Sequence, residues 1–67
     1  MTFGEKLRQS RREKGMSTAF FAGKAGVCTS IMYKYELDVQ QPTLKRFRKM
    51  CEVLDMTPSK FLEGVDI

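Results

Sequence analysis

The sequence predicts an all-α fold, a compact bundle of five short helices. Helix-capping residues recur along the whole chain of 67 residues, and the apolar residues that follow them are mostly spaced three or four positions apart. No segment alternates between apolar and polar residues over more than a few positions, as a half-buried β-strand would. A chain of this length forms one domain, which we expect to span residues 1–67, and it leaves little room for a deep pocket.

The first helix is expected to begin at Phe3. Thr2 and Glu5 have the spacing of a capping box, in which each side chain accepts a hydrogen bond from the backbone N–H of the other residue. Phe3 and Leu7 then share one face of the helix, and Gly15 provides a stop beyond its end.

A helix-turn-helix unit is predicted at about residues 17–37. Ser17 can cap a second helix over residues 18–24, and a third helix covers about residues 28–37. Ala25-Gly26 forms the hinge between them. Two helices joined by a tight turn with a glycine form the unit whose second helix enters the major groove of DNA. This stretch is the strongest indication of function in the sequence.

Two more helices follow the loop that ends at Pro42. Thr43 is the predicted N-cap of the fourth helix, and Thr57-Pro58 opens a short fifth helix that ends near Glu63 and leaves a tail of residues 64–67. The fourth helix carries an apolar stripe made of Leu44, Phe47, Met50, Cys51 and Leu54. The predicted core contains Leu7, Phe21, Val27, Met32, Leu44, Phe47, Met50 and Leu54.

The charge of the chain favours a polyanionic partner. Twelve lysines and arginines stand against eight acidic residues, a net charge of +4, and the excess lies in residues 1–34. A positive field of this kind steers association with nucleic acid in a salt-dependent way. Charge alone is also compatible with an ordinary solvated surface.

Several classes of function are not expected. The chain has two cysteines and no histidine, so it offers neither a zinc ligand set nor a disulfide framework. It shows no nucleophile–base pair and no glycine-rich phosphate loop, and we therefore expect no enzyme, no metal site and no small-molecule cofactor. No apolar run approaches the length of a membrane span, so we expect no membrane partner and a reduced, cytoplasmic protein.

From Phe3 to Leu62 the order of these features resembles the Cro/cI-type (XRE-like) helix-turn-helix family of transcriptional regulators. The resemblance is carried by the stretch FGEKLRQSRREKGMS, by Phe21-Ala22, Ala25-Gly26-Val27, Tyr35-Glu36 and Pro42, and by Met56-Thr57-Pro58 at the start of the fifth helix. It implies the lambda-repressor-like fold with the helix-turn-helix at its second and third helices. It also implies a sequence-specific regulator of phage, prophage or accessory-element type that binds double-stranded DNA.

The resemblance also implies roles for individual residues. Arg11 and Glu36 occupy the positions of a structural ion pair between the first and third helices. The base-reading positions of the third helix are Thr29, Ser30, Tyr33 and Lys34. The expected phosphate contacts are Ser17, Thr18, Lys24, Gln40, Gln41, Thr43, Lys45 and Arg46. The alternative is that these residues form the polar, solvated face of an amphipathic segment.

Some positions depart from the family pattern. Thr18 stands where relatives often carry a glutamine that clamps a phosphate, and Cys28 is a poor N-cap, for which Thr29 can substitute. Asp38 replaces a common glycine and adds a negative charge near the expected DNA surface. Phe20 replaces a polar residue and is expected to lie across Met16, with a partner contact as the alternative.

A homodimer is expected, because one domain of this size covers one half of an operator and a two-fold dimer places two third helices about 34–36 Å apart. The candidate contacts are Val39, Phe61, Val65 and Ile67, although Phe61 can instead complete the core of the monomer. The alternative function is a protein-interaction module that keeps this fold and binds a protein partner. Thr18, Phe20, Cys28 and Asp38 are the residues that favour it.

Overall fold

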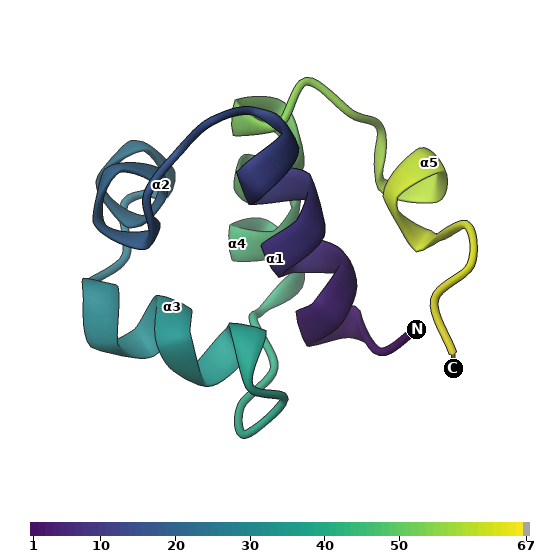
Figure 1. Cartoon of the computed structure of the whole chain (residues 1–67), viewed down its shortest axis with the longest axis horizontal. Helices are drawn as coiled ribbons and strands as arrows, with labels where there is room; N and C mark the ends of the chain where they lie inside the picture. The colour runs from purple at the N-terminus through teal and green to yellow at the C-terminus, as the bar shows by residue number, and fades with distance from the viewer. Residues whose placement is uncertain (67) are drawn as a thin grey trace.

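The computed structural model describes residues 1–66, and these residues form helices and connecting turns with no β-strand among them. The helices are α1 (Phe3–Glu13), α2 (Thr18–Ala25), α3 (Thr29–Glu36), α4 (Leu44–Val53) and α5 (Pro58–Leu62). α3 packs against α1 and α2, while α2 and α5 pack against α4. α5 lies on the opposite side of the molecule from α2 and α3, and the two termini lie close together (Figure 1). The predicted all-α bundle is confirmed.

Most helices begin where their capping residues predict. The side chains of Thr2, Ser17, Thr43 and Thr57 each accept a hydrogen bond from a backbone N–H three residues further along. At Thr2 the capping box is complete, because its own N–H donates to Glu5 at 2.8 Å. Gly26 ends α2 in the left-handed conformation at φ 75°, which turns the chain sharply into α3.

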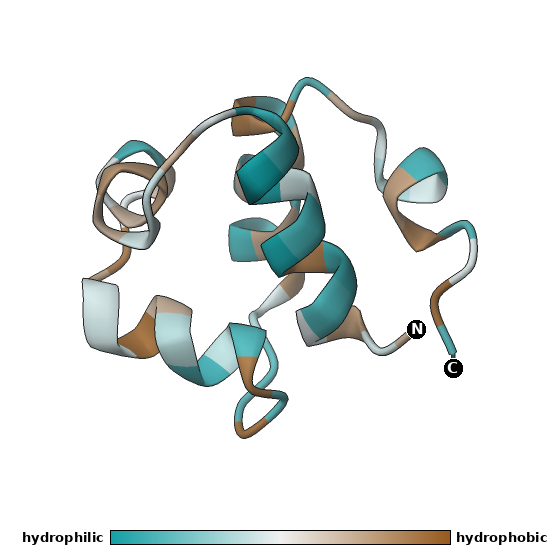
Figure 2. Ribbon diagram, viewed as in Figure 1, coloured by the Kyte–Doolittle hydropathy of each residue, from teal (hydrophilic) through white to brown (hydrophobic). Residues whose placement is uncertain are grey.

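The core joins residues from every helix. Leu7, Phe21, Met32, Leu54 and Phe61 are each fully buried. α1 is hydrophilic over most of its length, so few of its residues reach this core (Figure 2). The partly buried Phe3 is one of them, and its ring lies 5.5 Å from that of Phe47 and 5.2 Å from that of Phe61. This aromatic cluster holds the N-terminus of α1 against α4 and α5.

Two expectations about apolar residues are wrong. Leu44 was expected in the core, but it is 71% exposed at the first position of α4. Phe61 was a candidate for a dimer interface, but it is fully buried and packs on Phe3 and Phe47. It completes the core of the monomer, as the alternative held. Val27, also expected in the core, is only partly buried against it.

Gly4 marks a close approach between α1 and the end of α3. A Cβ at this position would collide with the carbonyl oxygen of Glu36 and would lie 2.7 Å from its carbonyl carbon and 2.8 Å from Oδ2 of Asp38. The two backbones can therefore meet only because Gly4 has no side chain.

We expect Gly4→Ala to lower the free energy of unfolding by about 1–3 kcal/mol, because the added methyl group forces the two backbones apart. Without a clash, alanine would stabilise the helix by about 1 kcal/mol relative to glycine. A loss of stability in Gly4→Ala therefore indicates the clash. Gly23→Ala is the matched control, since a Cβ there meets nothing within 4 Å, and it should stabilise the protein slightly. Urea unfolding followed by circular dichroism measures both, and stabilisation by both substitutions would contradict the close approach.

Candidate nucleic-acid interface

α3 turns one continuous stripe of side chains to solvent. The stripe has the spacing i, i+3, i+4 and i+7 of a single helical face, and it consists of Ser30, Tyr33, Lys34 and Leu37. The opposite face is buried through Met32, Tyr35 and Glu36. α3 lies along the lower edge of the molecule, where this stripe can reach a partner (Figure 1). Three of the expected base-reading residues belong to the stripe.

The fourth expected base-reading residue is less exposed than the other three. Thr29 is only partly exposed. Leu37, which the sequence reasoning did not single out, is 68% exposed. Its i+7 spacing from Ser30 was the signal that could have placed it on the stripe.

The orientation of α3 is fixed by an ion pair with α1. Arg11 donates to the carboxylate of Glu36 twice, from Nε to Oε2 at 2.8 Å and from Nη2 to Oε1 at 3.3 Å. A third hydrogen bond runs from Nη1 of Arg11 to the carbonyl oxygen of Met16 at 2.8 Å. Both side chains of the pair are almost buried. The bidentate geometry ties α3 to α1 and to the turn that leads into α2.

Asp38 lies just beyond α3 and binds the start of α1. Its backbone is left-handed, with φ 61°. Its carboxylate accepts hydrogen bonds from the N–H of Gly4 at 2.8 Å and from the hydroxyl of Thr2 at 2.6 Å. The negative charge that was expected near a DNA surface is therefore directed at the positive end of the α1 dipole.

At the start of α2 the side chains expected to contact phosphate are largely engaged. The hydroxyl of Ser17 accepts the N–H of Phe20 at 3.1 Å, and Thr18 is only 7% exposed. What this end of α2 can offer an anion is the backbone N–H groups of its first turn. Lys24 lies on the outer side of the same helix, with Nζ 5.4 Å from the centre of the Phe20 ring. Phe20 itself is 54% exposed, so it is less covered than the sequence suggested.

A second group of candidate phosphate contacts follows α3. It is exposed throughout and consists of Gln40, Gln41, Thr43, Lys45 and Arg46. The hydroxyl of Thr43 accepts the N–H of Arg46 at 3.2 Å. The guanidinium of Arg46 donates to the hydroxyl of Tyr35 at 2.9 Å, which ties the first turn of α4 to the buried face of α3.

Cys28 precedes α3 without capping it. It occupies the N-cap position, but its side chain forms no capping hydrogen bond that meets the usual geometry, and Thr29 does not replace it because that residue is already helical. The thiol lies 3.5 Å from the hydroxyl of Ser30. This contact and the nearby backbone N–H of Ile31 lower the pKa of Cys28, whereas burial raises the pKa of Cys51.

Residues 1–66 contain no helix that is both long and apolar enough to cross a membrane. Within the same range, no three acidic or cysteine side chains come together in a way that could hold a metal ion.

The known proteins that resemble this chain are transcriptional regulators and DNA-binding domains of repressors. The HTH-type transcriptional regulator SinR of Bacillus licheniformis is 34% identical over 64 residues, which cover 94% of this chain. A crystal structure of SinR in complex with DNA is 34% identical, covers 91% of this chain and 98% of its own, and superposes with a TM-score of 0.84. The DNA-binding domain of the P22 c2 repressor shares the fold at 20% identity, with a TM-score of 0.90 over 96% of this chain and 84% of its own.

No protein-family model matches the chain. The chain spans 58% of the length of the Bacillus licheniformis SinR protein, less than two thirds of that relative.

We expect Arg11→Ala to leave most of the protein unfolded at 25 °C. Removal of one partner leaves the carboxylate of Glu36 buried and unpaired, which costs about 3–5 kcal/mol. That is close to the roughly 3–5 kcal/mol that a core of this size can supply. Arg12→Ala is the control, because it removes the neighbouring exposed arginine and should change stability by less than about 0.5 kcal/mol. Circular dichroism and urea titration measure both variants. A folded Arg11→Ala protein of unchanged stability would show that the ion pair contributes little.

Proposed function

Because the chain belongs to the Cro/cI-type helix-turn-helix family of transcriptional regulators, we propose that it regulates transcription by binding a specific duplex DNA sequence. The observation that carries this proposal is the exposed stripe Ser30, Tyr33, Lys34 and Leu37 on a helix held rigidly by the Arg11–Glu36 pair. The solved complex of the relative SinR with DNA supports it. The proposed regulator acts in the cytoplasm and carries out no catalytic step.

In this proposal α3 lies in the major groove and its stripe reads the base edges. Lys34 donates to O6 or N7 of a guanine, while the hydroxyls of Thr29 and Ser30 pair with either kind of base pair. Tyr33 lies beside them, and the apolar Leu37 can pack on a thymine methyl group. These contacts give sequence preference, whereas phosphate contacts give affinity and register.

The proposed phosphate contacts lie on both helices of the unit and on the segment that follows it. From α2 they comprise the first-turn N–H groups beside Ser17 and Thr18, together with Lys24. From the following segment they comprise Gln40, Gln41, Thr43, Lys45 and Arg46. The carboxylate of Asp38 is engaged by Gly4 and Thr2 at the start of α1. A protein-binding module is therefore less favoured, since one of its main indications has a structural role.

We also propose that the regulator binds DNA as a homodimer. Exposed apolar side chains lie on the loop after α3, at the start of α4 and at the end of α5, at Val39, Leu44 and Leu62. A shallow groove of about 480 Å³ runs between the last two and is lined by Val65 as well. Ile67, the last candidate contact, lies outside the described residues.

Selection from a random duplex library at about 150 mM salt tests the proposed function, because that concentration suppresses most sequence-independent binding. We expect an enriched palindrome whose half-sites are centred about 10 base pairs apart, which is the spacing of a two-fold dimer on one face of DNA. Enrichment of a single half-site would contradict the homodimer and keep the DNA-binding role. An unenriched pool would overturn sequence-specific regulation.

We expect Lys34→Ala to weaken binding to the selected sequence about tenfold or more, with a smaller effect on an unrelated duplex, because a lysine–guanine contact discriminates between bases. Lys45→Ala should weaken both equally, since a phosphate contact carries no sequence information. Lys45 is the better comparison than Arg46, whose guanidinium also bonds to Tyr35. Fluorescence anisotropy with both duplexes measures the ratio. Equal losses from the two substitutions would remove Lys34 from the base-reading set.

A further inference from the structure

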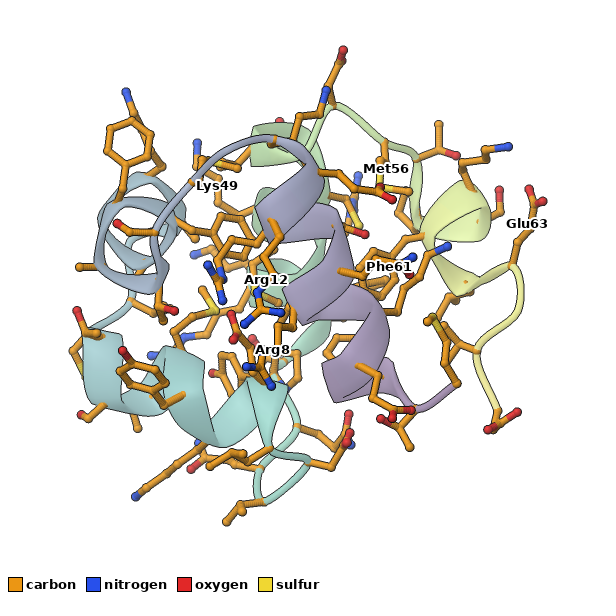
Figure 3. All side chains as sticks on the ribbon, in the orientation of Figure 1. Arg8, Arg12, Lys49, Met56, Phe61 and Glu63 are labelled. Atoms are coloured by element: carbon orange, nitrogen blue, oxygen red, sulfur yellow. The ribbon has the colours of Figure 1, made fainter. Side chains whose placement is uncertain are left out.

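A cleft opens between α1 and the helix-turn-helix unit. Its volume is about 340 Å³, and arginines of α1 supply much of its lining. The other walls come from Thr18 at the start of α2 and from Tyr33, Glu36 and Leu37 at α3 and its C-terminal end. Arg8 and Arg12 lie on the side of α1 that faces α3 (Figure 3).

The lining of this cleft carries excess positive charge. Three guanidinium groups, those of Arg8, Arg11 and Arg12, stand against the single carboxylate of Glu36, which leaves a net charge of +2. Arg11 already neutralises Glu36. Neither Arg8 nor Arg12 forms an ion pair with any carboxylate of residues 1–66. A guanidinium has five N–H donors, and Arg11 donates three hydrogen bonds to other groups of residues 1–66.

The spacing of the two unpaired arginines suits one shared anion. Arg8 and Arg12 are four residues apart, so their side chains leave the same face of α1 about one turn apart. Two like charges in this arrangement repel each other, and an anion held between them removes that repulsion. Guanidinium groups bind the oxygens of a phosphate with paired, charge-assisted hydrogen bonds.

The position of the cleft indicates which anion it meets. Tyr33 and Leu37 belong both to its wall and to the exposed stripe of α3, so the cleft lies directly beside the face that is proposed to read bases. A helix seated in the major groove has the phosphate backbone along its flank. Thr18, which stands at the start of α2, is buried and offers no accessible side chain for a phosphate, whereas the two arginines do.

We propose that the cleft between α1 and α3 binds a backbone phosphate of duplex DNA, with Arg8 and Arg12 as its ligands. This inference rests on the proposed function. It adds α1 to the elements that are proposed to contact DNA, which so far are α2, α3 and the segment that follows α3. α1 then has two roles, since Arg11 orients α3 from inside the fold while Arg8 and Arg12 hold the DNA strand beside it.

The test is the salt dependence of DNA binding by the full chain. The double variant Arg8→Ala/Arg12→Ala is compared with Arg48→Ala/Lys60→Ala. The second variant removes the same charge from exposed residues near α5, where Arg48 lines a separate cleft. A random-sequence duplex of about 20 base pairs is the probe, and anisotropy gives the affinity over a range of roughly 50–200 mM salt. Thermal unfolding checks that both variants are folded.

We expect the Arg8/Arg12 variant to bind about tenfold more weakly and to lower the slope of log K against log salt by about 1, because one phosphate contact is lost. The Arg48/Lys60 variant should keep the wild-type slope, because salt at these concentrations largely screens the interaction of distant, exposed charges with DNA. Arg8→Lys/Arg12→Lys should restore the slope. If wild type binds and both alanine variants behave alike, the cleft is not a phosphate site, although the proposed function stands.

Two further outcomes separate the remaining possibilities. If the wild-type chain binds no duplex even at about 50 mM salt, both the proposed function and this inference are overturned. The ¹⁵Nε–H signals of Arg8 and Arg12 give a second readout. A shift on addition of duplex supports the site. A shift on addition of inorganic phosphate that duplex fails to reproduce would assign the cleft to a small anion and overturn its assignment to DNA.

Discussion

The ion pair between Arg11 and Glu36 determines how the helix-turn-helix unit is held against α1. Its hydrogen bonds connect α1, the end of α3 and the carbonyl of Met16, just before α2 begins. A single guanidinium therefore joins three segments, one of which, α1, is largely hydrophilic. Such a buried pair contributes less net stability than its contacts suggest, because both charges lose their hydration. Its main contribution is to define one orientation of α3, which a purely apolar contact between α1 and α3 would specify less sharply.

A second contact between the same two helices acts at the other end of α1. Gly4 lets the backbone of α1 approach that of Glu36, and Asp38 then bonds to the N–H of Gly4 and to the hydroxyl of Thr2. Two attachments about two helical turns apart on α1 prevent α3 from rotating about either one. The exposed stripe of α3 is held in one position as a consequence. The same arrangement directs the carboxylate of Asp38 toward the N-terminus of α1.

The sequence was sufficient to predict the helices and, through the family resemblance, the Arg11–Glu36 pair that joins α1 to α3. It was insufficient to predict the other contacts between the helices. Thr2, Ser17, Thr43 and Thr57 act on N–H groups three residues away, so each helix start could be read locally, and the order of the motifs matched a known family. The hydrogen bond between Asp38 and Gly4 joins residues 34 positions apart, and no local sequence pattern predicts it. Leu44 was misplaced for a related reason, since helical spacing shows which residues share a face and not where the covering neighbour ends. The exposure of Arg8 and Arg12 toward α3 likewise depends on the packing of α1.

The composition of the exposed stripe also bears on how a regulator of this kind would choose its site. The stripe of Ser30, Tyr33, Lys34 and Leu37 can read guanine through Lys34, but it includes no arginine, glutamine or asparagine, whose planar groups form paired hydrogen bonds with guanine or adenine. Each such pair discriminates by about 1–3 kcal/mol, so α3 has fewer means of direct readout than a stripe that carries them. Unpaired cations are plentiful on α1 and at the start of α4. A proposed DNA complex built on these groups would take much of its affinity from phosphates. Its selectivity would then depend on how readily a sequence adopts the groove width and spacing that a dimer requires.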